Sequence, residues 1–401
     1  MSNSRKNFQL KDIVNIQSST RIFEKEYVEE GIPFYRSKEI IEKQKGNDVS
    51  TNLYISQERF NKIKQAYSVP RQGDILLTSV GTIGIPYMVR ENEQFYFKDG
   101  NLTWFNNFSK EIDNKYFYYW ILSEVGKEAL NSILIGTTQK ALTIKDLKSL
   151  EISLPPLSEQ KRISSILSSF DNKIEQLKKQ NNILEDIAQS IFKEWFVKYN
   201  FPNKDGKPYK DNNGKMIDSE LGLIPEGWRV GKLGEIVKCF DSKRIPLSKE
   251  EREQRKGKYP YYGATEIMDY VNEYLFDGKY LLLAEDGSVQ TNQGYPVLQL
   301  VDGKFWVNNH THVLQGKEPF STEYIYLLMK KFNITNIVTG AVQPKINKTN
   351  LLSLELLLPD RKLVQNFNKT NTFLFEKIFE NSYNITNLTK TKTALLNKLL
   401  Q

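Results

Sequence analysis

The side chains that most often carry catalysis or bind metal ions are few in this chain. The 401 residues contain one cysteine, Cys239, and two histidines, His310 and His312. Histidines at alternate positions of a β-strand share a face, so this pair has the spacing of two metal ligands. A repeat within the chain, described below, places Leu102 and Trp104 at the same positions, which favours structural or ligand-facing roles. We therefore predict no metal site, and a single cysteine excludes an intrachain disulfide.

The sequence also lacks the motifs of enzymes that act on nucleic acids. An adenine methyltransferase needs a glycine-rich cofactor loop and an Asn/Asp-Pro-Pro-aromatic tetrapeptide, but Pro155 and Pro156 lie between leucines. Neither a phosphate-binding glycine-lysine loop nor a paired-carboxylate nuclease pattern is present. We predict no catalytic residue and no cofactor in this chain. An enzyme with an unrecognised active site is the alternative from a different class.

The charge balance indicates a polyanionic partner such as nucleic acid. The chain has 56 basic and 48 acidic residues, a net charge of +8, and 12% aromatic residues. Its N-terminus is polar and no run of eighteen apolar residues occurs, so neither a signal peptide nor a membrane span is predicted. The expected location is the cytoplasm.

Side chains able to read base edges are arginine, lysine, asparagine, glutamine and hydroxyl groups, and here they gather in loops marked by glycine. The candidates in the first half of the chain are Arg36, Ser37, Lys38, Thr78, Ser79, Thr82, Thr137, Thr138, Gln139 and Lys140. Those in the second half are Lys243, Arg244, Tyr262, Glu285, Gln290, Asn308, His310, Gln343 and Lys345. A solvated loop residue or a turn cap is the alternative for each of them.

The elements that must position these loops are built twice. Residues 10–14 are echoed by 233–237, and 33–35 by 260–262. The firmest match has eight identities in twenty aligned positions. In it Gly136, Gln139, Leu147, Ser149, Leu150, Glu151, Leu154 and Pro155 recur as Gly340, Gln343, Leu351, Ser353, Leu354, Glu355, Leu358 and Pro359. The chain is therefore read as a tandem duplication of one domain, with a period too long for a solenoid.

Each copy shows short β-branched and aromatic runs broken by glycine, followed by a helix-like segment at 114–131 or 321–332. This pattern predicts an α+β fold. The expected domains are 1–153 and 228–357, with a long helix at 154–199, a linker at 200–227 and a second long helix at 358–401. The offset between matched positions falls from 227 at Pro33 to 205 at Gly73, so the first domain carries about 22 extra residues. Such insertions often change binding preference.

Apolar residues at alternating steps of four and three predict a coiled-coil seam on the first long helix. They are Ile163, Leu167, Phe170, Ile174, Leu177, Asn181, Leu184, Ala188, Ile191 and Trp195. The stripe returns 204 residues later at Phe367, Asn371, Leu374, Ile378, Asn381, Ile385, Leu388, Lys392, Leu395 and Leu399. Antiparallel packing of the two helices would give approximate twofold symmetry, with Ser158 and Asp360 as predicted N-caps. The seam asparagines are either register devices or solvent-facing positions.

In these features the chain resembles the DNA-sequence specificity subunits of type I restriction-modification systems. The resemblance rests on the run Leu-Pro-Pro-Leu-Ser-Glu-Gln at 154–160, the close of the first helix at 191–196, and Ile-Pro-Glu-Gly-Trp at 224–228. Residues 278–287 and 307–314 are similar to one version of the target recognition domain. The second helix departs from the pattern, because Arg361, Lys362 and Leu363 replace the Glu-Gln entry and Lys392 lies in its seam.

The resemblance implies two target recognition domains, each reading one half of a bipartite asymmetric site in double-stranded DNA, and two helices that set the spacer. It implies a non-catalytic subunit whose partners are two modification subunits and the restriction subunits. S-adenosylmethionine is then expected in the partner methyltransferase. A specificity subunit of a methylation-only complex and a coiled-coil adaptor without sequence-specific DNA binding remain the alternatives.

Overall fold

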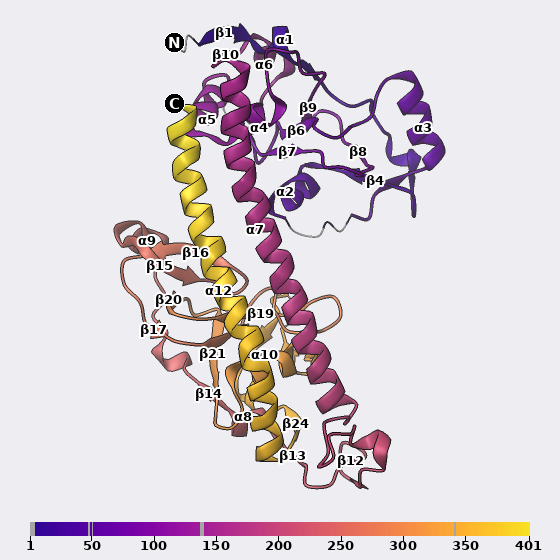
Figure 1. Ribbon diagram of the computed structural model, residues 1–401, viewed down its shortest axis with the longest axis vertical. Helices are drawn as coiled ribbons and strands as arrows, with labels where there is room; N and C mark the ends of the chain where they lie inside the picture. Colours follow the sequence, from indigo (N-terminus) through magenta and orange to yellow (C-terminus); the bar gives the residue numbers. More distant parts are fainter. Residues whose placement is uncertain (1–4, 47–48, 50, 137–139, 341) are drawn as a thin grey trace. The chain divides into compact units, whose positions relative to one another are not determined.

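The computed structural model describes residues 5–46, 49, 51–136, 140–340 and 342–401 (Figure 1). The chain forms two compact units, unit 1 with residues Met1–Gln176 and Ile385–Gln401, and unit 2 with Leu177–Asn384. Each unit contains one globular part and a segment of each long helix. The predicted domain boundaries gave the long helices segments of their own, whereas the compact units divide each helix between them.

The main sheet of unit 1 is four-stranded and antiparallel, in the order β2-β9-β6-β7. Its strands are β2 (Asn15–Gln17), β9 (Leu102–Asn106), β6 (Ile75–Thr78) and β7 (Pro86–Met88). Side chains alternate across β6, so that Ile75 and Leu77 face one core cluster while Leu76 faces another. Because both faces are covered, every residue of β6 is buried.

A second sheet in unit 1 has the order β3-β5-β4-β8, in which β4 and β8 are parallel. Its short strands are β3 (Tyr27–Val28), β5 (Tyr54–Ile55), β4 (Ile32–Tyr35) and β8 (Tyr96–Phe97). The extra residues predicted between 41 and 72 contain β5 and the helix α3 (Gln57–Ala66), and α2 (Ser37–Lys45) precedes them. The remaining elements of unit 1 are β1 (Lys6–Gln9), α1 (Leu10–Ile13), η1 (Glu24–Glu26), α6 (Ile144–Ser149) and β10 (Glu151–Leu154).

The helix predicted at 114–131 is interrupted in the structure. It forms α4 (Asn114–Leu122) and α5 (Glu124–Ser132), with Ser123 at the junction. The Ser123 hydroxyl donates to the Trp120 carbonyl oxygen at 2.7 Å and accepts from the Gly126 amide at 3.1 Å. A Cβ on Gly126 would lie 1.8 Å from that carbonyl oxygen, so the close turn requires glycine. The single-helix prediction was wrong because the helical periodicity continues across this break.

Unit 2 repeats the main sheet of unit 1 but differs in the second sheet, where the parallel pair is central and not at one edge. Its main antiparallel sheet has the order β14-β21-β18-β19, and its second sheet has the order β16-β15-β20-β17 with β15 and β20 parallel. The main strands are β14 (Val237–Cys239), β21 (Thr311–Gly316), β18 (Tyr280–Ala284) and β19 (Leu298–Val301). The others are β16 (Ile267–Val271), β15 (Lys256–Tyr262), β20 (Lys304–Val307) and β17 (Phe276–Asp277).

The remaining elements of unit 2 surround these sheets. They are η2 (Lys193–Val197), η3 (Lys210–Asn212), β11 (Met216–Ile217), β12 (Ile224–Pro225), β13 (Arg229–Lys232), α8 (Leu233–Ile236), η4 (Asp241–Lys243), α9 (Lys249–Gln254), α10 (Thr322–Lys330), η5 (Thr335–Ile337), β22 (Val338–Thr339), β23 (Lys345–Ile346), α11 (Lys348–Leu352) and β24 (Glu355–Leu358). The predicted linker is ordered here, because Phe201 stacks on Tyr209 and on Trp228, with centroids 4.6 and 5.9 Å away.

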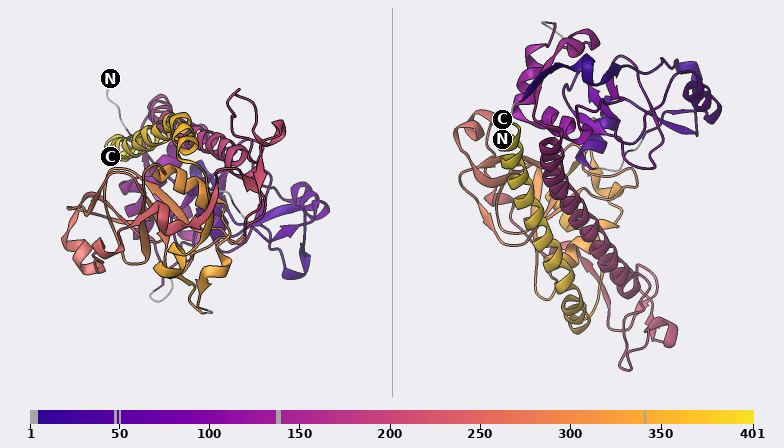
Figure 2. Two further views of the ribbon diagram at one scale, coloured as in Figure 1. Left: turned by 90° about the horizontal axis from the view of Figure 1, so that it is seen from below. Right: turned by 45° about the horizontal axis from the view of Figure 1, so that its top comes forward.

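The long helices are α7 (Leu157–Phe192) and α12 (Arg361–Leu400). They run alongside each other within each unit (Figures 1 and 2). In unit 1, Ile163 and Leu167 share a core cluster with Leu396 and Leu400, which is an antiparallel register. Lys392, the charged seam residue, lies 2.5 Å from a carboxylate oxygen of Asp171. The seam therefore accommodates this lysine through an ion pair.

In unit 2 two of the seam asparagines, Asn181 and Asn381, bond across the helix pair, whereas Asn371 bonds the Phe367 oxygen of its own helix. The Asn381 amide donates to the Asn181 carbonyl oxygen at 2.8 Å, and Asn381 is 1% exposed. Asn181 in turn donates to the Ile378 backbone oxygen and the Ser382 hydroxyl. The burial of Asn381 and the bonds from its nitrogen to the facing helix fit a register device better than a solvent-facing position.

The entries of the two helices are built differently. The Asp360 carboxylate accepts from the Lys362 and Leu363 amides, as predicted for an N-cap. The prediction for Ser158 was wrong, since α7 already begins at Leu157. The neighbouring Gln160 is 1% exposed and fixes the helix to the start of α4. Its amide accepts from the Asp113 N–H and donates to the Glu111 and Pro155 oxygens, all at 2.9 Å.

Candidate nucleic-acid interface

Charged side chains converge in unit 2 where the ends of β18 and β21 meet the segment after β14. The Arg244 guanidinium lies 2.6 Å from a Glu285 carboxylate oxygen, and both side chains are 13% exposed. The same guanidinium donates to the Asn309 and Thr311 carbonyl oxygens at 3.2 and 2.8 Å. Because a buried charge needs a partner and full hydrogen bonding, Arg244 holds this loop together.

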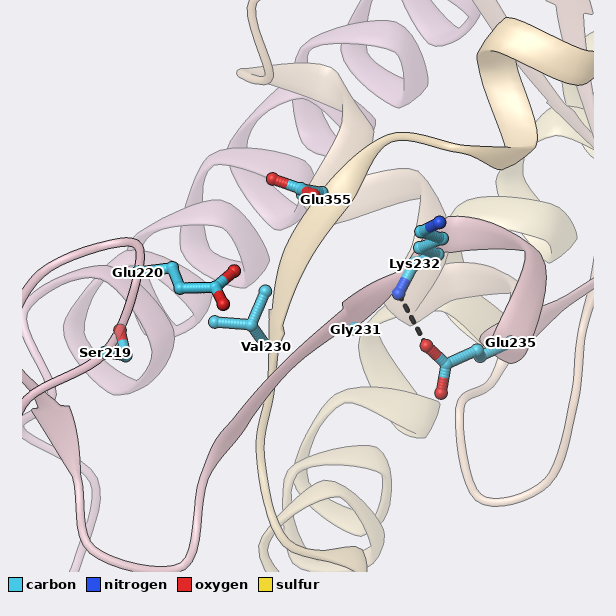
Figure 3. Close-up of a pocket in the computed structure, with 7 residues that line it drawn as sticks. All are labelled: Ser219, Glu220, Val230, Gly231, Lys232, Glu235 and Glu355. Atoms are coloured by element: carbon cyan, nitrogen blue, oxygen red, sulfur yellow. Dashed lines mark hydrogen bonds between the residues drawn. The ribbon is translucent and has the colours of Figure 1, made fainter.

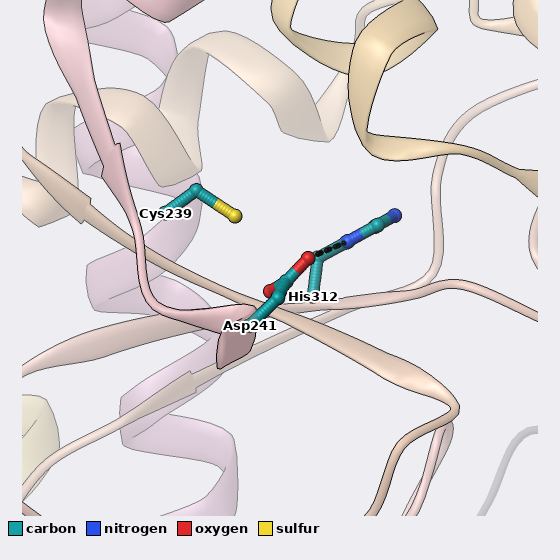
Figure 4. A group of neighbouring side chains, drawn as sticks. All are labelled: Cys239, Asp241 and His312. Atoms are coloured by element: carbon teal, nitrogen blue, oxygen red, sulfur yellow. Dashed lines mark hydrogen bonds and ion pairs between the residues drawn. The ribbon is translucent and has the colours of Figure 1, made fainter. Parts of the chain in front are cut away.

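Asp241 and His312 form a buried pair next to this arginine (Figure 4). His312 is fully buried, with Nδ1 2.6 Å from Asp241 Oδ2 and Nε2 2.8 Å from the Ile346 carbonyl oxygen. Burial opposes ionisation of Asp241, but the hydrogen bond and charge of His312 lower its pKa to about 2. Both ring nitrogens of His312 thus face oxygen atoms, which hold the ring in one orientation.

Cys239 completes a group of three possible metal ligands with Asp241 and His312, whose ligand atoms lie within 4.8 Å of one another. Burial raises the pKa of the Cys239 thiol to about 11. Metal binding needs a thiolate and a free imidazole nitrogen, and both nitrogens of His312 are already bonded. The arrangement is a closed hydrogen-bonded pair beside a protonated thiol, and its donor set does not fit a metal ion.

A second group of charged side chains, next to Glu285, is more exposed than the buried pair. His310 Nδ1 is 3.2 Å from Asp286, and the Lys345 ammonium is 3.2 Å from Asp286 and 3.5 Å from Glu285. The His310 and Lys345 side chains are 51% and 46% exposed. Burial opposes ionisation of Asp286, yet its hydrogen bonds to His310 and Lys345 lower its pKa. The carboxylates of Asp286 and Glu285 thus hold the His310 and Lys345 side chains in place, while about half of each side chain remains exposed to a ligand.

The backbone hydrogen bonds identify the equivalent place in unit 1. The Glu285 amide donates to the His310 oxygen and the Glu285 oxygen accepts from Ile346. In unit 1 the Ser79 amide donates to the Asn101 oxygen and the Ser79 oxygen accepts from Leu142. Ser79 therefore takes the place of Glu285, and Asn101 that of His310.

At this place unit 1 has hydroxyl groups instead of charges. Thr103 occupies the position of His312, and its hydroxyl lies 2.7 Å from that of Ser79. The sequence-based pairing of the histidines with Leu102 and Trp104 was wrong by one residue. A shift of one residue moves a strand's side chains to the opposite face, so the error placed the histidines opposite buried apolar residues. The comparison of identical residues between the two halves missed this one-residue shift, because few identities flank the strand.

One informative pair of residues was missed by sequence reasoning. Arg21 and Arg244 are separated by the same offset as residues 10–14 and 233–237, and both precede isoleucine. Arg244 is enclosed by carboxylates, whereas Arg21 is exposed and lies 5.3 Å from the Phe23 ring centroid. The repeated Arg-Ile pair was the available signal. Asp241, which meets His312, and Asp286, which meets His310 and Lys345, gave no such signal because these partners are distant in the sequence.

The predicted DNA-contacting residues differ in accessibility. Thr78, Ser79 and Asn308 are buried, and Arg244, Glu285 and Tyr262 are largely enclosed, so their burial favours loop support over direct contact. Ser37 and Gln290 are half-buried. The exposed candidates, whose DNA contact stays a prediction, are Arg36, Lys38, Thr82, Lys140, Lys243, His310, Gln343 and Lys345. Thr137, Thr138 and Gln139 lie outside the described residues.

An acidic pocket in unit 2 is a poor match for a polyanion. It has a volume of about 470 Å³ and lies beside β13 and β24 (Figure 3). Its lining includes the carboxylates of Glu220, Glu235 and Glu355, and Glu235 accepts from the Lys232 amide at 2.7 Å. Like charges would repel phosphates there, so the candidate interface is assigned to the His310 and Lys345 loops instead.

Two copies of one mixed α/β fold, each completed by segments of two long helices, define a tandem-repeat protein with two candidate interfaces. The profile of the type I restriction modification DNA specificity domain matches residues 4–209 and again 225–395. The chain therefore belongs to the type I restriction-modification DNA specificity family. Among the described residues, no helix has the length and apolar character needed to cross a membrane.

Individual relatives of the chain are named as specificity subunits of type I restriction enzymes. The chain is 29% identical over 386 residues to the type I restriction enzyme MjaIX specificity subunit of Methanocaldococcus jannaschii, covering 90% of this chain and 84% of that protein. It is 27% identical over 332 residues to the MjaVIII specificity subunit of the same organism, covering 75% and 72%. The crystal structure of a type I S subunit from M. genitalium shares the fold, with a TM-score of 0.57 at 17% identity over 100% and 97% of the two chains.

Proposed function

We propose that this chain is the DNA sequence-recognition and scaffold subunit of a type I restriction-modification complex. One observation carries the proposal: the same fold occurs twice, and the equivalent loop positions hold hydroxyl groups in unit 1 and an ion-pair cluster in unit 2. Two reading surfaces of different chemistry suit a bipartite and asymmetric site. Each unit would read one half of that site.

The exposed groups supply the chemistry of recognition. Lysines hold phosphates, whereas amide, imidazole and hydroxyl groups discriminate base edges. Unit 2 offers His310 in one loop and Gln343 and Lys345 in another, and unit 1 offers Thr82 and Lys140. The net charge of +8 favours approach to DNA.

The catalytic reactions would be carried out by partner subunits. We infer two modification subunits that carry S-adenosylmethionine and flip the target adenine into their own pockets, together with restriction subunits. The chain itself would be non-catalytic and act in the cytoplasm. Modification-sensitive sequencing of a host genome, with and without this chain, tests the proposal. We expect a bipartite methylated motif that disappears on deletion, and an unchanged methylation pattern would contradict it.

The helices would set the distance between the two half-sites. Seven residues added to each of α7 and α12 keep the antiparallel seam in register and add about 10 Å, roughly three base-pair steps. We expect the methylated motif to keep both half-sites and gain about three base pairs of spacer. Adding the residues to α7 alone is the control, because it misaligns Asn181 and Asn381 and should destabilise the chain. An unchanged spacer in the double insertion would refute the spacing role.

A further inference from the structure

Unit 2 contains an aromatic pocket whose lining shares no residue with the charged loops. It has a volume of about 550 Å³ and is formed by α9, β15, β20 and residues 272–275. Its lining includes Arg255, Tyr259, Asn272, Glu273, Tyr274 and Trp306, and we call it the aromatic pocket. Its volume falls within the range of small-ligand sites, which are mostly apolar with a few polar groups.

The rings of the aromatic pocket are held in place by neighbouring groups. Trp306 is 4% exposed and its indole N–H donates to the Ile245 carbonyl oxygen at 2.6 Å, so it forms a fixed wall. Tyr259 and Tyr274 have ring centroids 5.0 Å apart. Tyr274 is 40% exposed, so a large part of its ring remains open to a ligand.

Cations surround these rings. Lys304 lies 4.6 Å from the Tyr274 centroid, Lys258 lies 5.2 Å from the Tyr259 centroid, and Arg255 lies 6.0 Å from the Trp306 centroid. Arg255 lines the pocket together with the carboxylates of Glu251 and Glu273, whereas Lys258 and Lys304 lie against the rings outside the lining. A flat aromatic guest whose attached anion lies on the side of these cations would stack on the rings and pair with the cations.

Two polar groups refine the choice of guest. Arg255 is 3.4 Å from Glu273, and both side chains are substantially exposed to solvent. Because an exposed ion pair contributes little free energy, a phosphate can take the place of Glu273 beside Arg255 at little cost. Asn272 supplies an amide that both donates and accepts, which matches the edge of a nucleobase. Rings, amide and cations together have the composition of sites that stack single bases and hold their phosphates.

We propose that the aromatic pocket binds a nucleobase attached to a phosphate, supplied either by a free mononucleotide or by an unstacked base of a DNA strand. The base would stack on Tyr274, and Arg255, Lys258 and Lys304 would contact the phosphate. The lining of this site contains none of His310, Gln343 and Lys345, so the proposal goes beyond the proposed function and does not depend on it.

Calorimetric titration of the full chain with adenosine monophosphate tests base recognition, and ribose 5-phosphate is the comparison without a base. We expect the base to strengthen binding. Tyr274→Ala should weaken it roughly five- to a hundredfold, as for loss of one stacked ring. The matched control is Tyr270→Ala, because Tyr270 is 39% exposed on β16 but is absent from the pocket lining. Unfolding curves of both variants check that the fold is kept.

A second titration distinguishes the two sources of the base. It compares a duplex carrying one bulged adenine with the same duplex carrying an abasic bulge. A preference for the adenine bulge that Tyr274→Ala abolishes supports a base from DNA, and binding of the mononucleotide without that preference supports a free nucleotide. Equal effects of the two tyrosine substitutions, or no base dependence with either probe, would overturn the proposal. If the unsubstituted chain binds the mononucleotide but does not bind an intact duplex, that result counts against the proposed function and not against the aromatic pocket.

Discussion

The two units place different chemistry on the same backbone. Ser79 and Glu285 make equivalent main-chain hydrogen bonds, yet the first meets a hydroxyl group and the second meets Arg244 and Lys345. The shared strand order of the two main sheets shows that this part of the fold does not depend on these side chains. Duplication therefore leaves the loop chemistry of one copy free to diverge without disturbing the other.

The helix entries differ in the same way. In unit 1, Gln160 joins α7 to the start of α4 through three hydrogen bonds. In unit 2 the matching residue is the fully buried Val364, and Asn368 bonds the Pro319 oxygen at 2.7 Å one helical turn later. Different side chains therefore attach the long helix to the globular part in the two units.

The largest expected difference between the units concerns the equivalent arginines. Arg244→Met leaves Glu285 and Asp241 buried without the guanidinium, and we expect it to lower the free energy of unfolding by about 3 kcal/mol. Arg21→Met removes an exposed side chain and should cost less than about 0.5 kcal/mol. Urea unfolding of both variants measures the contrast. Similar losses would show that the ion cluster does not distinguish the units.

The helix entries give a second contrast. Gln160→Val introduces the residue type of unit 2 and leaves the Asp113 amide and two carbonyl oxygens without their partner. We expect a loss of about 2 kcal/mol, since each buried unpaired group is costly. Asn368→Val removes fewer bonds from a half-buried position and should cost about 1 kcal/mol. Denaturant midpoints test the order, and a larger loss for Asn368→Val would reverse the comparison.

Acid should weaken unit 2 through Asp241, whereas unit 1 has Ser18 at the matching position. The pKa of Asp241 is lowered to about 2 from an ordinary value of 3.8. Its stabilising contribution is therefore present above about pH 4 and is lost as the pH falls toward 2. We expect it to be about 2 kcal/mol. Thermal unfolding from pH 5 to 2 should show a shallower decline for Asp241→Asn than for the unsubstituted chain, and identical declines would exclude this contribution.

Much of the fold was predictable because it follows regular periods. The four-three spacing located both long helices, and the identities between residues 136–155 and 340–359 revealed the duplication. The break at Ser123 was not predictable, because it depends on the close approach of Gly126 to the Trp120 carbonyl oxygen. The seam residue Lys392 was also unexplained until its partner Asp171 was seen on the facing helix.

The candidate interface was predictable only as a set of loops. Glycines and polar residues marked the right segments, but they did not distinguish the enclosed Arg244 from the exposed Lys345. That distinction depends on Asp241 in η4 and on Glu285 and Asp286 in the segment after β18, which are far apart in the sequence. The one-residue shift between strands β9 and β21 likewise appeared only through their hydrogen bonds.

Exchange of one recognition domain tests most directly whether each unit reads its own half of the site. Residues 1–153 would be replaced by the equivalent domain of another specificity subunit, and the methylated motif would be mapped by modification-sensitive sequencing. We expect one half of the motif to change while the other half keeps its bases. A change in both halves, or in neither, would contradict the account.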